Sequence, residues 1–409
     1  MPFTGVSAMD RKLEFVRLAQ GGGGPGFGEL CRRFGISRTL GYRVLARYRD
    51  GGAAGLAERS RRPLTSPRQT DAEIEAAVLA VRAAHPAWGG RKIAAVLKRQ
   101  GLAPPSASTV TQILRRGGVT LGELGGGASA FIRFEHPEPN DLWQMDFKGH
   151  VPMRQGRLHP LTVLDDHSRF AVVLAACADE QTETVKTCLI KAFELYGLPW
   201  RITADNGSPW GNGPQDPYTP LGVWLIERDI RLGHSRPYHP QTQGKDERFH
   251  RTLKAEALSG PPFESLDHAA RHLDRWRDIY NTERPHEAIG LATPFDRYRL
   301  SPRQYRPEPE PFDYAPDDQL RRVQQGGHLS FKSRRIKVPK AFAGRAVALR
   351  PTPRSDIFEV FFRATNLGAI DLSLQTDHPQ RVTDVPGLNK GEGGRLPRPP
   401  GRASLSGDG

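Results

Sequence analysis

The sequence predicts an α/β protein in which a central sheet of mixed strand direction follows a helical region and precedes a small β-rich unit. Three observations lead to this fold class. Apolar residues recur at helical spacing from residue 10 to about residue 118, in segments separated by glycine and proline. Three β-rich runs then occupy 141–178, and the helical and extended segments that follow them alternate, as in a mixed sheet. From about residue 314 the chain consists of short β-rich runs.

Length and composition set the class of protein. The 409 residues predict two to four domains, because one domain commonly takes roughly 100 to 200 residues. No apolar run approaches the roughly 18 to 20 residues of a membrane span, so a membrane protein is not expected. The N-terminus lacks an apolar signal core, and Cys31, Cys177 and Cys188 form no CxxC pair. We therefore expect a reducing, cytoplasmic location.

The net charge of +14 is unevenly distributed along the chain. Residues 1–135 contain 21 Lys and Arg against 10 Asp and Glu, and 314–409 contains 16 against 9, whereas 136–313 contains 22 against 26. Basic flanks around a slightly acidic centre are typical of a protein that binds a polyanion and gathers cations at a central carboxylate site. A GC-rich genome would explain the excess of Arg over Lys, but it does not explain this segregation.

Residues 1–62 are predicted to form a helix-turn-helix domain. A helix over 10–20 ends at the GGGGPG run, and a short helix in GELCRRF is followed by a tight turn and a helix with Ser37 as N-cap. The side chains expected to face the core are Leu40, Val44, Leu45 and Tyr48. Those expected to point outward, toward a DNA groove or phosphates, are Arg38, Thr39, Tyr42, Arg43 and Arg47. The alternative is a helical hairpin with a charged, solvent-exposed face.

A second helix-turn-helix domain is predicted over 68–120, after a basic linker that contains proline. Its helices are expected in DAEIEAAVLAVRAAHP, WGGRKIAAVLKRQG and PSASTVTQILRRGG. Ser106 or Ser108 caps the last helix, and the side chains expected to face inward are Val110, Ile113 and Leu114. Those left for DNA are Ser108, Thr109, Gln112 and Arg115. The alternative is an ordinary helical unit in which Ser and Thr serve only as caps.

The central segment, 136–300, is predicted to form the mixed sheet and its helices. Strands are expected in DLWQMDFKGHV and on both sides of the DDHSR turn, followed by a helix in ETVKTCLIKAFELYG and a strand in PWRITADNG. Further helices are expected in TPLGVWLIERD, QGKDERFHRTLKAEAL and SLDHAARHLDRWRDIYNTERP. A small β-barrel-like domain is predicted over 314–375, and residues 376–409, rich in Pro, Gly and Arg, are expected to form a disordered tail.

Three carboxylates occupy marked positions in the central segment. Asp146 lies inside the first strand, Asp205 at the end of a later strand, and Glu247 in the helix that begins near QGKDERF. Converging anions repel each other unless cations lie between them, and hard oxygen ligands without nearby Cys favour Mg²⁺ or Mn²⁺. Two such ions would bind the attacking and leaving oxygens of a phosphoryl transfer. Spacing alone leaves open that these acids are solvated surface residues.

Five ordered motifs carry a more specific signal. WQMDFKG, LTVLDDHSRF, ITADNG, RPYHPQTQGKDERFHRTLKAE and YNTERPHEAIG closely resemble the integrase-core DDE transposases of bacterial insertion sequences, which are relatives of retroviral integrases. The resemblance extends from about Asp141 to Tyr298 and implies a ribonuclease H-like fold for 136–300. It also implies that Asp146, Asp205 and Glu247 are catalytic and bind two Mg²⁺ or Mn²⁺ ions.

For the third acid, the sequence offers two candidate residues. The PWGNGPQDPYTP loop makes the interval between Asp205 and Glu247 longer than is common in the family. Asp246 stands beside Glu247, but adjacent helical side chains point about 100° apart, so only one can reach a given metal pair. We assign Glu247. Glu256 lies nine residues further on, about 13 Å along the same helix, and is a poor ligand.

Neighbouring residues are expected to have supporting roles. Turn geometry is expected for Asp165 and Asp166, and Asn206 and Gly207 are expected to shape the loop after Asp205, with an unusual φ at Gly207. DNA contacts are expected near His239 and Gln241, whereas ordinary packing or surface positions are expected for His234 and His250. Two roles are equally open for Arg248, Arg251 and Lys254, namely contact with DNA phosphates or a solvated helix face.

The resemblance implies a DNA transposase that binds double-stranded element ends and performs metal-dependent hydrolysis and strand transfer. The freed 3′-hydroxyl attacks a target strand, so no covalent protein–DNA intermediate is needed, and two ends require a homo-multimer assembled on DNA. One alternative is a non-catalytic DNA-binding regulator with a degenerate core, which the presence of all three acids disfavours. The other is a ribonuclease H-like nuclease, which the paired helix-turn-helix units disfavour.

Overall fold

The computed structural model describes residues 7–58, 69–119, 135–211, 218–234, 244–374 and 380–382. The chain divides into two compact units, one over residues 1–69 and one over residues 70–409. No helix in the described part of the chain is both long and apolar enough to cross a membrane. His239 and Gln241, which were expected near DNA, lie outside the described residues.

The first unit is a three-helix body with a core of its own. Its helices are α1 (Ala8–Gln20), α2 (Phe27–Arg33) and α3 (Arg38–Gly55). Ser37 is the N-cap of α3, because its side chain accepts a hydrogen bond from the Leu40 backbone N–H, as predicted. The helices enclose a cluster of buried residues, namely Phe15, Val16, Leu30, Cys31, Val44 and Leu56.

Two expectations for α3 were wrong. Leu40, expected in the core, is 42% exposed, and Gly41 takes the inner position. A Cβ at Gly41 would lie 2.7 Å from the Cys31 sulfur, so the close packing of α3 on α2 admits only glycine there. Arg47, expected to point outward, is half-buried, and its guanidinium donates a hydrogen bond to the carbonyl of Ala57.

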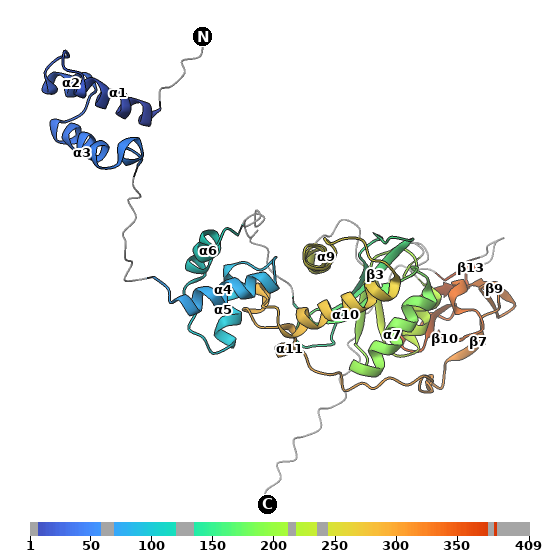
Figure 1. Cartoon of the computed structure of the whole chain (residues 1–409). Coiled ribbons are helices and arrows are strands. Elements are labelled where there is room, and N and C mark those ends of the chain that lie inside the picture. The colour runs from blue at the N-terminus through green and yellow to red at the C-terminus, as the bar shows by residue number, and fades with distance from the viewer. Residues whose placement is uncertain are drawn as a thin grey trace, which may run out of the picture. The chain divides into compact units, whose positions relative to one another are not determined.

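The second unit begins with another three-helix body, which packs on the rest of the unit (Figure 1). Its helices are α4 (Ala72–Ala84), α5 (Gly90–Arg99) and α6 (Ala107–Arg116), and Ser106 caps α6. Val110, Ile113 and Leu114 are buried as predicted. Ile279 of the later helix α10 packs against this core, so the body is attached to the central domain by apolar as well as polar contacts.

The central sheet has the predicted mixed direction. Its strands are β1 (Trp143–Phe147), β2 (Val151–Pro152), β3 (Arg157–Asp165), β4 (Ala171–Cys177), β5 (Arg201–Ala204) and β6 (Arg231–His234). β3 runs antiparallel to both β1 and β4, whereas β1, β5 and β6 are parallel to one another. The order β4–β3–β1–β5–β6 confirms the expected ribonuclease H-like fold. β6 was not predicted.

Helices cover both faces of this sheet. They are α7 (Thr182–Tyr196), α8 (Pro220–Ile226), α9 (Gly244–Ala257), α10 (Leu266–Thr282) and α11 (Pro294–Arg297), with a short 3₁₀ turn at Glu287–Ile289. Leu161 and Val163 of β3 share a core with α7, whereas Leu158 and Leu164 share a core with α9 and α10. The sheet is therefore buried on both faces, as its apolar strands indicate.

The C-terminal region forms two small sheets around one core. One sheet has the order β12 (Thr365–Asp371), β11 (Ile357–Phe362), β10 (Ala346–Pro351), β7 (Gln319–Arg322). The other has the order β13 (Gln380–Arg381), β9 (Arg334–Lys337), β8 (His328–Phe331), and a 3₁₀ turn spans Lys340–Phe342. β13 lies inside the range expected to form a disordered tail, so that expectation was wrong there. Most of the remaining range lies outside the described residues.

The β-rich region and the central domain share α8. Leu221, Trp224 and Leu225 of this helix belong to the core under the sheet, whereas Val223 and Ile226 belong to the core of the β-rich region. A fragment that ends before residue 314 would expose these two side chains. Experiments on catalysis therefore require the full chain.

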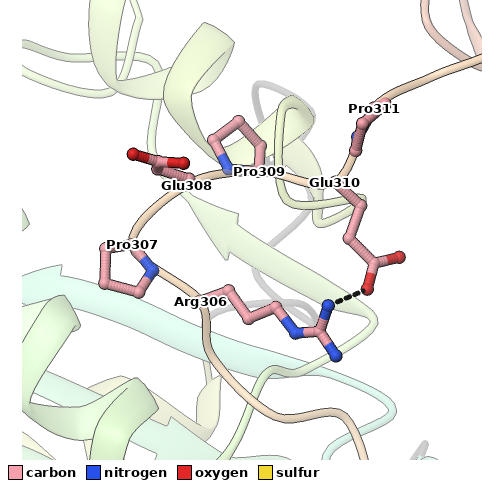
Figure 2. Close-up of a pocket in the computed structure, with 6 residues that line it drawn as sticks. All are labelled: Arg306, Pro307, Glu308, Pro309, Glu310 and Pro311. Atoms are coloured by element: carbon pink, nitrogen blue, oxygen red, sulfur yellow. Dashed lines mark ion pairs between the residues drawn. The ribbon is translucent and has the colours of Figure 1, made fainter.

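The connection between these two regions is proline-rich and is held at several points. Arg306 and Glu310 form an ion pair of 2.8 Å across the RPEPEP segment (Figure 2). Arg228 donates to the carbonyl of Pro307, and Arg363 to the carbonyl of Glu310, over 2.8 and 2.9 Å. The open recess along Arg306–Pro311 is lined by this connecting segment alone and holds none of the predicted site residues.

Candidate active site

Two of the predicted catalytic acids are neighbours at one end of the sheet. β1 and β5 are parallel and adjacent, and Gln144 pairs with Thr203. Asp146 lies two residues further along β1, and Asp205 lies two residues after Thr203, directly beyond the end of β5. Carboxyl ends of parallel strands are where α/β sheets commonly carry their functional groups. The strand register therefore places the two carboxylates side by side.

The electrostatics of Asp146 reflect this proximity. Burial and the negative charge of Asp205 together raise the pKa of the Asp146 carboxyl to about 6. The side chain remains 36% exposed, so it is accessible from solvent. A partly buried pair of carboxylates that repel each other is a favourable place for a cation.

The third acid is positioned by α9, which packs against β1. Glu247 lies in the first turn of this helix, and its side chain is exposed. Its neighbour Asp246 is buried, and Oδ1 of Asp246 finds no hydrogen-bond partner among the described residues. Burial, and next the charge of Asp146, hold the pKa of Asp246 well above its usual range.

The three predicted acids are not gathered into a closed set of ligands. Within the described residues, no group of three or more His, Cys, Asp or Glu side chains is arranged to hold a metal ion. Asp146 and Asp205 are brought together by the sheet, and Glu247 begins the helix beside them with its carboxylate in solvent. The segment 235–243, which leads into α9, lies outside the described residues.

His250, for which the sequence predicted an ordinary packing or surface position, lies at the site beside Asp146. Its Nε2 lies 2.9 Å from Oγ1 of Thr162, which in turn donates to the carbonyl of Asp146 over 2.9 Å. Its Nδ1 lies 3.8 Å from Oδ2 of Asp146. Burial lowers the pKa of His250 to about 4, so the imidazole is neutral at pH 7. Its position three residues after Glu247, on one face of a helix, is the signal that could have found it.

The loop after Asp205 is shaped differently from the prediction. The backbone N–H of Gly207 donates to Oδ1 of Asp205 over 3.0 Å, but Gly207 does not have the predicted positive φ. Instead, a Cβ at Gly207 would lie 3.2 Å from Oδ2 of Asp205, so glycine keeps space beside the carboxylate. His234 contacts the carbonyl of Asp205 through Nδ1, at 2.8 Å, and so supports the same loop.

Most of the side chains predicted to contact DNA are accessible. On α9, the exposed residues are Arg248, Arg251 and Lys254. On α3 they are Arg38, Thr39, Tyr42 and Arg43, and on α6 they are Ser108, Gln112 and Arg115, with Thr109 half-buried. Each set lies on the solvent-facing side of its helix within its own unit.

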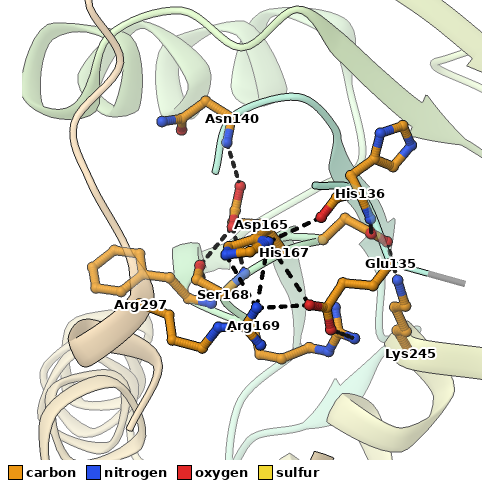
Figure 3. A network of polar contacts seen from close by, with 11 residues as sticks. Glu135, His136, Asn140, Asp165, His167, Ser168, Arg169, Lys245 and Arg297 are labelled. Atoms are coloured by element: carbon orange, nitrogen blue, oxygen red, sulfur yellow. Dashed lines mark hydrogen bonds and ion pairs between the residues drawn. The ribbon is translucent and has the colours of Figure 1, made fainter. Parts of the chain in front are cut away.

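The turn residues Asp165 and Asp166 are both buried, and Asp165 belongs to the polar network of Figure 3. Asp165 has the predicted turn role, because it accepts hydrogen bonds from the N–H and the hydroxyl of Ser168 over 2.8 and 2.5 Å. It also accepts the backbone N–H of Asn140 over 2.7 Å, which fixes the chain at the entrance to β1. Asp166 has only distant partners, which are described below.

The raised pKa of Asp146 leads to a prediction for stability. We expect Asp146→Asn to raise the melting temperature of the metal-free chain at about pH 8. Because the pKa of about 6 in the folded protein exceeds the usual 3.8, the ionised carboxyl costs the folded state free energy above pH 6. Screening of this 36% exposed side chain reduces the cost to about 1 kcal/mol, or about 2–4 °C.

The difference in melting temperature between Asp146→Asn and the wild type is expected to shrink as the pH falls through 6. Below this pH the wild-type carboxyl in the folded protein becomes neutral, like asparagine. Calorimetry in the presence of a chelator, from about pH 5 to 8, measures it. Glu183→Gln, at an exposed carboxylate on α7, is the control and should show no such trend. A stabilisation that does not change with pH would contradict the raised pKa of Asp146 in the folded protein.

Models of known protein families together match most of the chain. Family models described as integrase core domain match residues 136–240 and 228–294. A helix-turn-helix domain model matches 11–63, and a homeodomain-like domain model matches 41–114. The model of the C-terminal domain of IS481 family transposases matches 318–378. The predicted helix-turn-helix and integrase-core character is thereby confirmed.

Individual relatives are similar over part of their length. The insertion element IS407 uncharacterized 31.7 kDa protein of Burkholderia multivorans is 25% identical over 211 residues, 51% of this chain and 74% of the relative. A putative transposase for insertion sequence element IS5376 of Geobacillus stearothermophilus is 24% identical over 250 residues, 59% of this chain and 61% of the relative. The HTLV-2 integrase catalytic core domain in complex with magnesium aligns with a TM-score of 0.31 and 17% identity, over 40% of this chain and 99% of that domain.

Proposed function

We propose that the chain cuts and joins DNA at the ends of a mobile element, because integrase core domain models match residues 136–240 and 228–294 and the model of the C-terminal domain of IS481 family transposases matches 318–378. The observation that carries this proposal is the pair of carboxylates, Asp146 in β1 and Asp205 directly after the adjacent parallel strand β5. The raised pKa of Asp146 supports it, because it indicates a site where a cation would be stabilised.

We propose Asp146, Asp205 and Glu247 as the ligands of two Mg²⁺ or Mn²⁺ ions. The donor set fits these hard cations, since it consists of carboxylate oxygens only. When bound, the ions would neutralise charge on the scissile phosphate and lower the pKa of water. The exposed position of Glu247 at the start of α9 leaves its carboxylate free to turn toward the other two.

The chain's own residues hold this site and its substrate. Neutral His250 and Thr162 fix the backbone of Asp146 from α9 and β3. The exposed cations Arg248, Arg251 and Lys254 continue along α9 and would contact DNA phosphates. Hydrolysis at an element end would free a 3′-hydroxyl, which would then attack a target strand without a covalent protein–DNA intermediate.

Recognition of the element ends is assigned to the two helix-turn-helix bodies. Base edges would be read by side chains of α3 and α6, among them Tyr42, Arg43 and Gln112, which are exposed. Since two ends must be processed together, at least two copies of the chain would assemble on DNA.

The test is the joining of a pre-cut end oligonucleotide into a plasmid by the full-length chain. We expect joining with Mg²⁺ or Mn²⁺ after chelator treatment, and none with Ca²⁺, which coordinates oxygen at longer distances and in looser geometry. Ca²⁺ should still support assembly on DNA, measured by gel shift. Joining that persists without any divalent ion would exclude the metal-dependent reaction.

The same assay tests end recognition when a scrambled oligonucleotide competes with the end sequence. Replacing Arg43 and Gln112 by alanine should reduce the preference for the end by about 10-fold or more, because each lost base contact costs about 1–3 kcal/mol. Arg32→Ala, at an exposed arginine of α2, is the matched control. An unchanged preference in the double variant would remove the recognition role from α3 and α6.

A further inference from the structure

Asp166 is a buried carboxylate whose partners all come from distant parts of the chain. Its side chain is 1% exposed and lies in the turn between β3 and β4. Oδ1 accepts a hydrogen bond from Nε2 of Gln144 over 2.6 Å and also pairs with the ammonium of Lys245. Oδ2 accepts the backbone N–H of His136 over 2.8 Å. Lys245 and His136 both belong to the polar network drawn in Figure 3.

Two of these partners lie two residues before a proposed metal ligand in the sequence. Gln144 precedes Asp146 by two residues on β1, and Lys245 precedes Glu247 by two residues in the first turn of α9. Side chains two apart on a strand lie on the same face, so Gln144 and Asp146 share one side of β1. The Asp166 carboxylate thus contacts both β1, which carries Asp146, and α9, which carries Glu247.

The turn itself does not require Asp166. Asp165 already accepts the hydrogen bonds that close the turn, from the N–H and hydroxyl of Ser168. The partners of Asp166 lie 22, 30 and 79 residues away in the sequence. A buried carboxylate is retained only where such partners compensate its desolvation, so its contacts define the relative position of the segments that supply them.

Lys245 forms an ion pair that connects the first turn of α9 to the turn between β3 and β4. Its side chain is only 19% exposed, and it pairs with Asp166 where Arg169 and Glu135 also lie nearby. An ammonium at this depth needs its partner, because an unpaired buried charge is costly. The pair therefore restrains how the first turn of α9 is rotated and how far it lies from the sheet. These two quantities set the position of the Glu247 backbone.

We propose that the contact of Asp166 with Lys245 and Gln144 is a positioning device that sets the spacing between Glu247 and Asp146, so that both carboxylates reach the same metal ions. The inference rests on the proposed function, because it presupposes Glu247 as a ligand. Lys245 and Asp166 are positioning residues, since they act through α9 and β1.

Lys245→Met tests this directly, with Lys245→Arg as the conservative variant. We expect Lys245→Met to weaken Mn²⁺ binding by about tenfold, as for other residues that orient metal ligands. Electron paramagnetic resonance of free Mn²⁺, titrated with the full chain without DNA, measures the affinity. The Mg²⁺ concentration for half-maximal strand joining should rise by a similar factor, and Lys245→Arg should restore both values to near wild type.

Lys191→Met, at an exposed lysine of α7, is the matched control and should bind Mn²⁺ as the wild type does. Circular dichroism verifies that Lys245→Met is folded. Wild-type Mn²⁺ affinity and wild-type Mg²⁺ dependence in folded Lys245→Met would overturn the proposal. A loss that Lys245→Arg does not restore would also overturn it. Failure of the wild-type chain itself to join strands with any divalent ion would instead overturn the proposed function.

Discussion

Strand joining is expected to fall by a factor on the order of 10³ or more when Asp146 or Asp205 is replaced by asparagine, or Glu247 by glutamine. Each change removes a negative charge that would bind a metal ion, but keeps the size of the side chain. Because the amide side chains fit the same space, the fold and the helix-turn-helix bodies should be unaffected. Joining of a pre-cut end measures the loss, and a gel shift measures the retained end binding.

Asp246→Asn is the matched control for the third position. Asp246 is buried, and burial holds the pKa of its carboxyl well above the usual range, so an amide of the same shape should replace it with a mild effect. The outcome that would reassign the third ligand is an inactive Asp246→Asn together with an active Glu247→Gln. That result would also explain why Asp246, rather than Glu247, points inward toward Asp146.

The second large effect is expected at Glu256, which joins the α4–α6 body to the central domain. Arg284 donates to both carboxylate oxygens of Glu256, over 3.0 and 3.1 Å, and the Lys92 ammonium of α5 lies 3.8 Å away. All three side chains are largely buried. Glu256→Gln would leave two buried cations without their anion and should lower the free energy of unfolding by about 3–5 kcal/mol.

Denaturant unfolding of the full chain, followed by circular dichroism and tryptophan fluorescence, measures this loss. Arg99→Ala serves as the control, because the Arg99–Asp296 pair joins the same two regions but is 42% and 52% exposed. It should change the free energy of unfolding by about 1 kcal/mol or less. A loss of only about 1 kcal/mol or less in Glu256→Gln would show that its ion pairs contribute no more than an exposed pair does.

The order of helices and strands was predicted well because it depends on local signals. Ser37 and Ser106 cap their helices through bonds to backbone groups three residues away, and such bonds are visible in the sequence. The apolar runs on either side of the DDHSR turn also predicted β3 and β4. β6 (RLGH) and β7 (QLRR) were missed because each contains a single apolar residue, too few to show the alternation of a strand, and pairing with neighbours defines them.

Errors in side-chain direction came from packing between elements. Leu40 has the spacing of a core residue, but the close approach of α2 gives that position to Gly41. Similarly, the TPLGVWLIERD segment predicted a helix, but not that its two apolar faces would join the central domain to the β-rich region. Helical periodicity shows which residues share a face, and only the partner decides which face is covered.

By itself, the sequence determined the α/β class, the helix-turn-helix segments and the acids proposed for catalysis, because these follow from periodicity, caps and ordered motifs within short stretches. Only the tertiary structure decided that Asp146 lies beside Asp205, that His250 supports Asp146, and that Asp166 contacts both β1 and α9. These contacts join residues 22 to 104 positions apart, so they exist only once strand register and helix packing have brought the segments together.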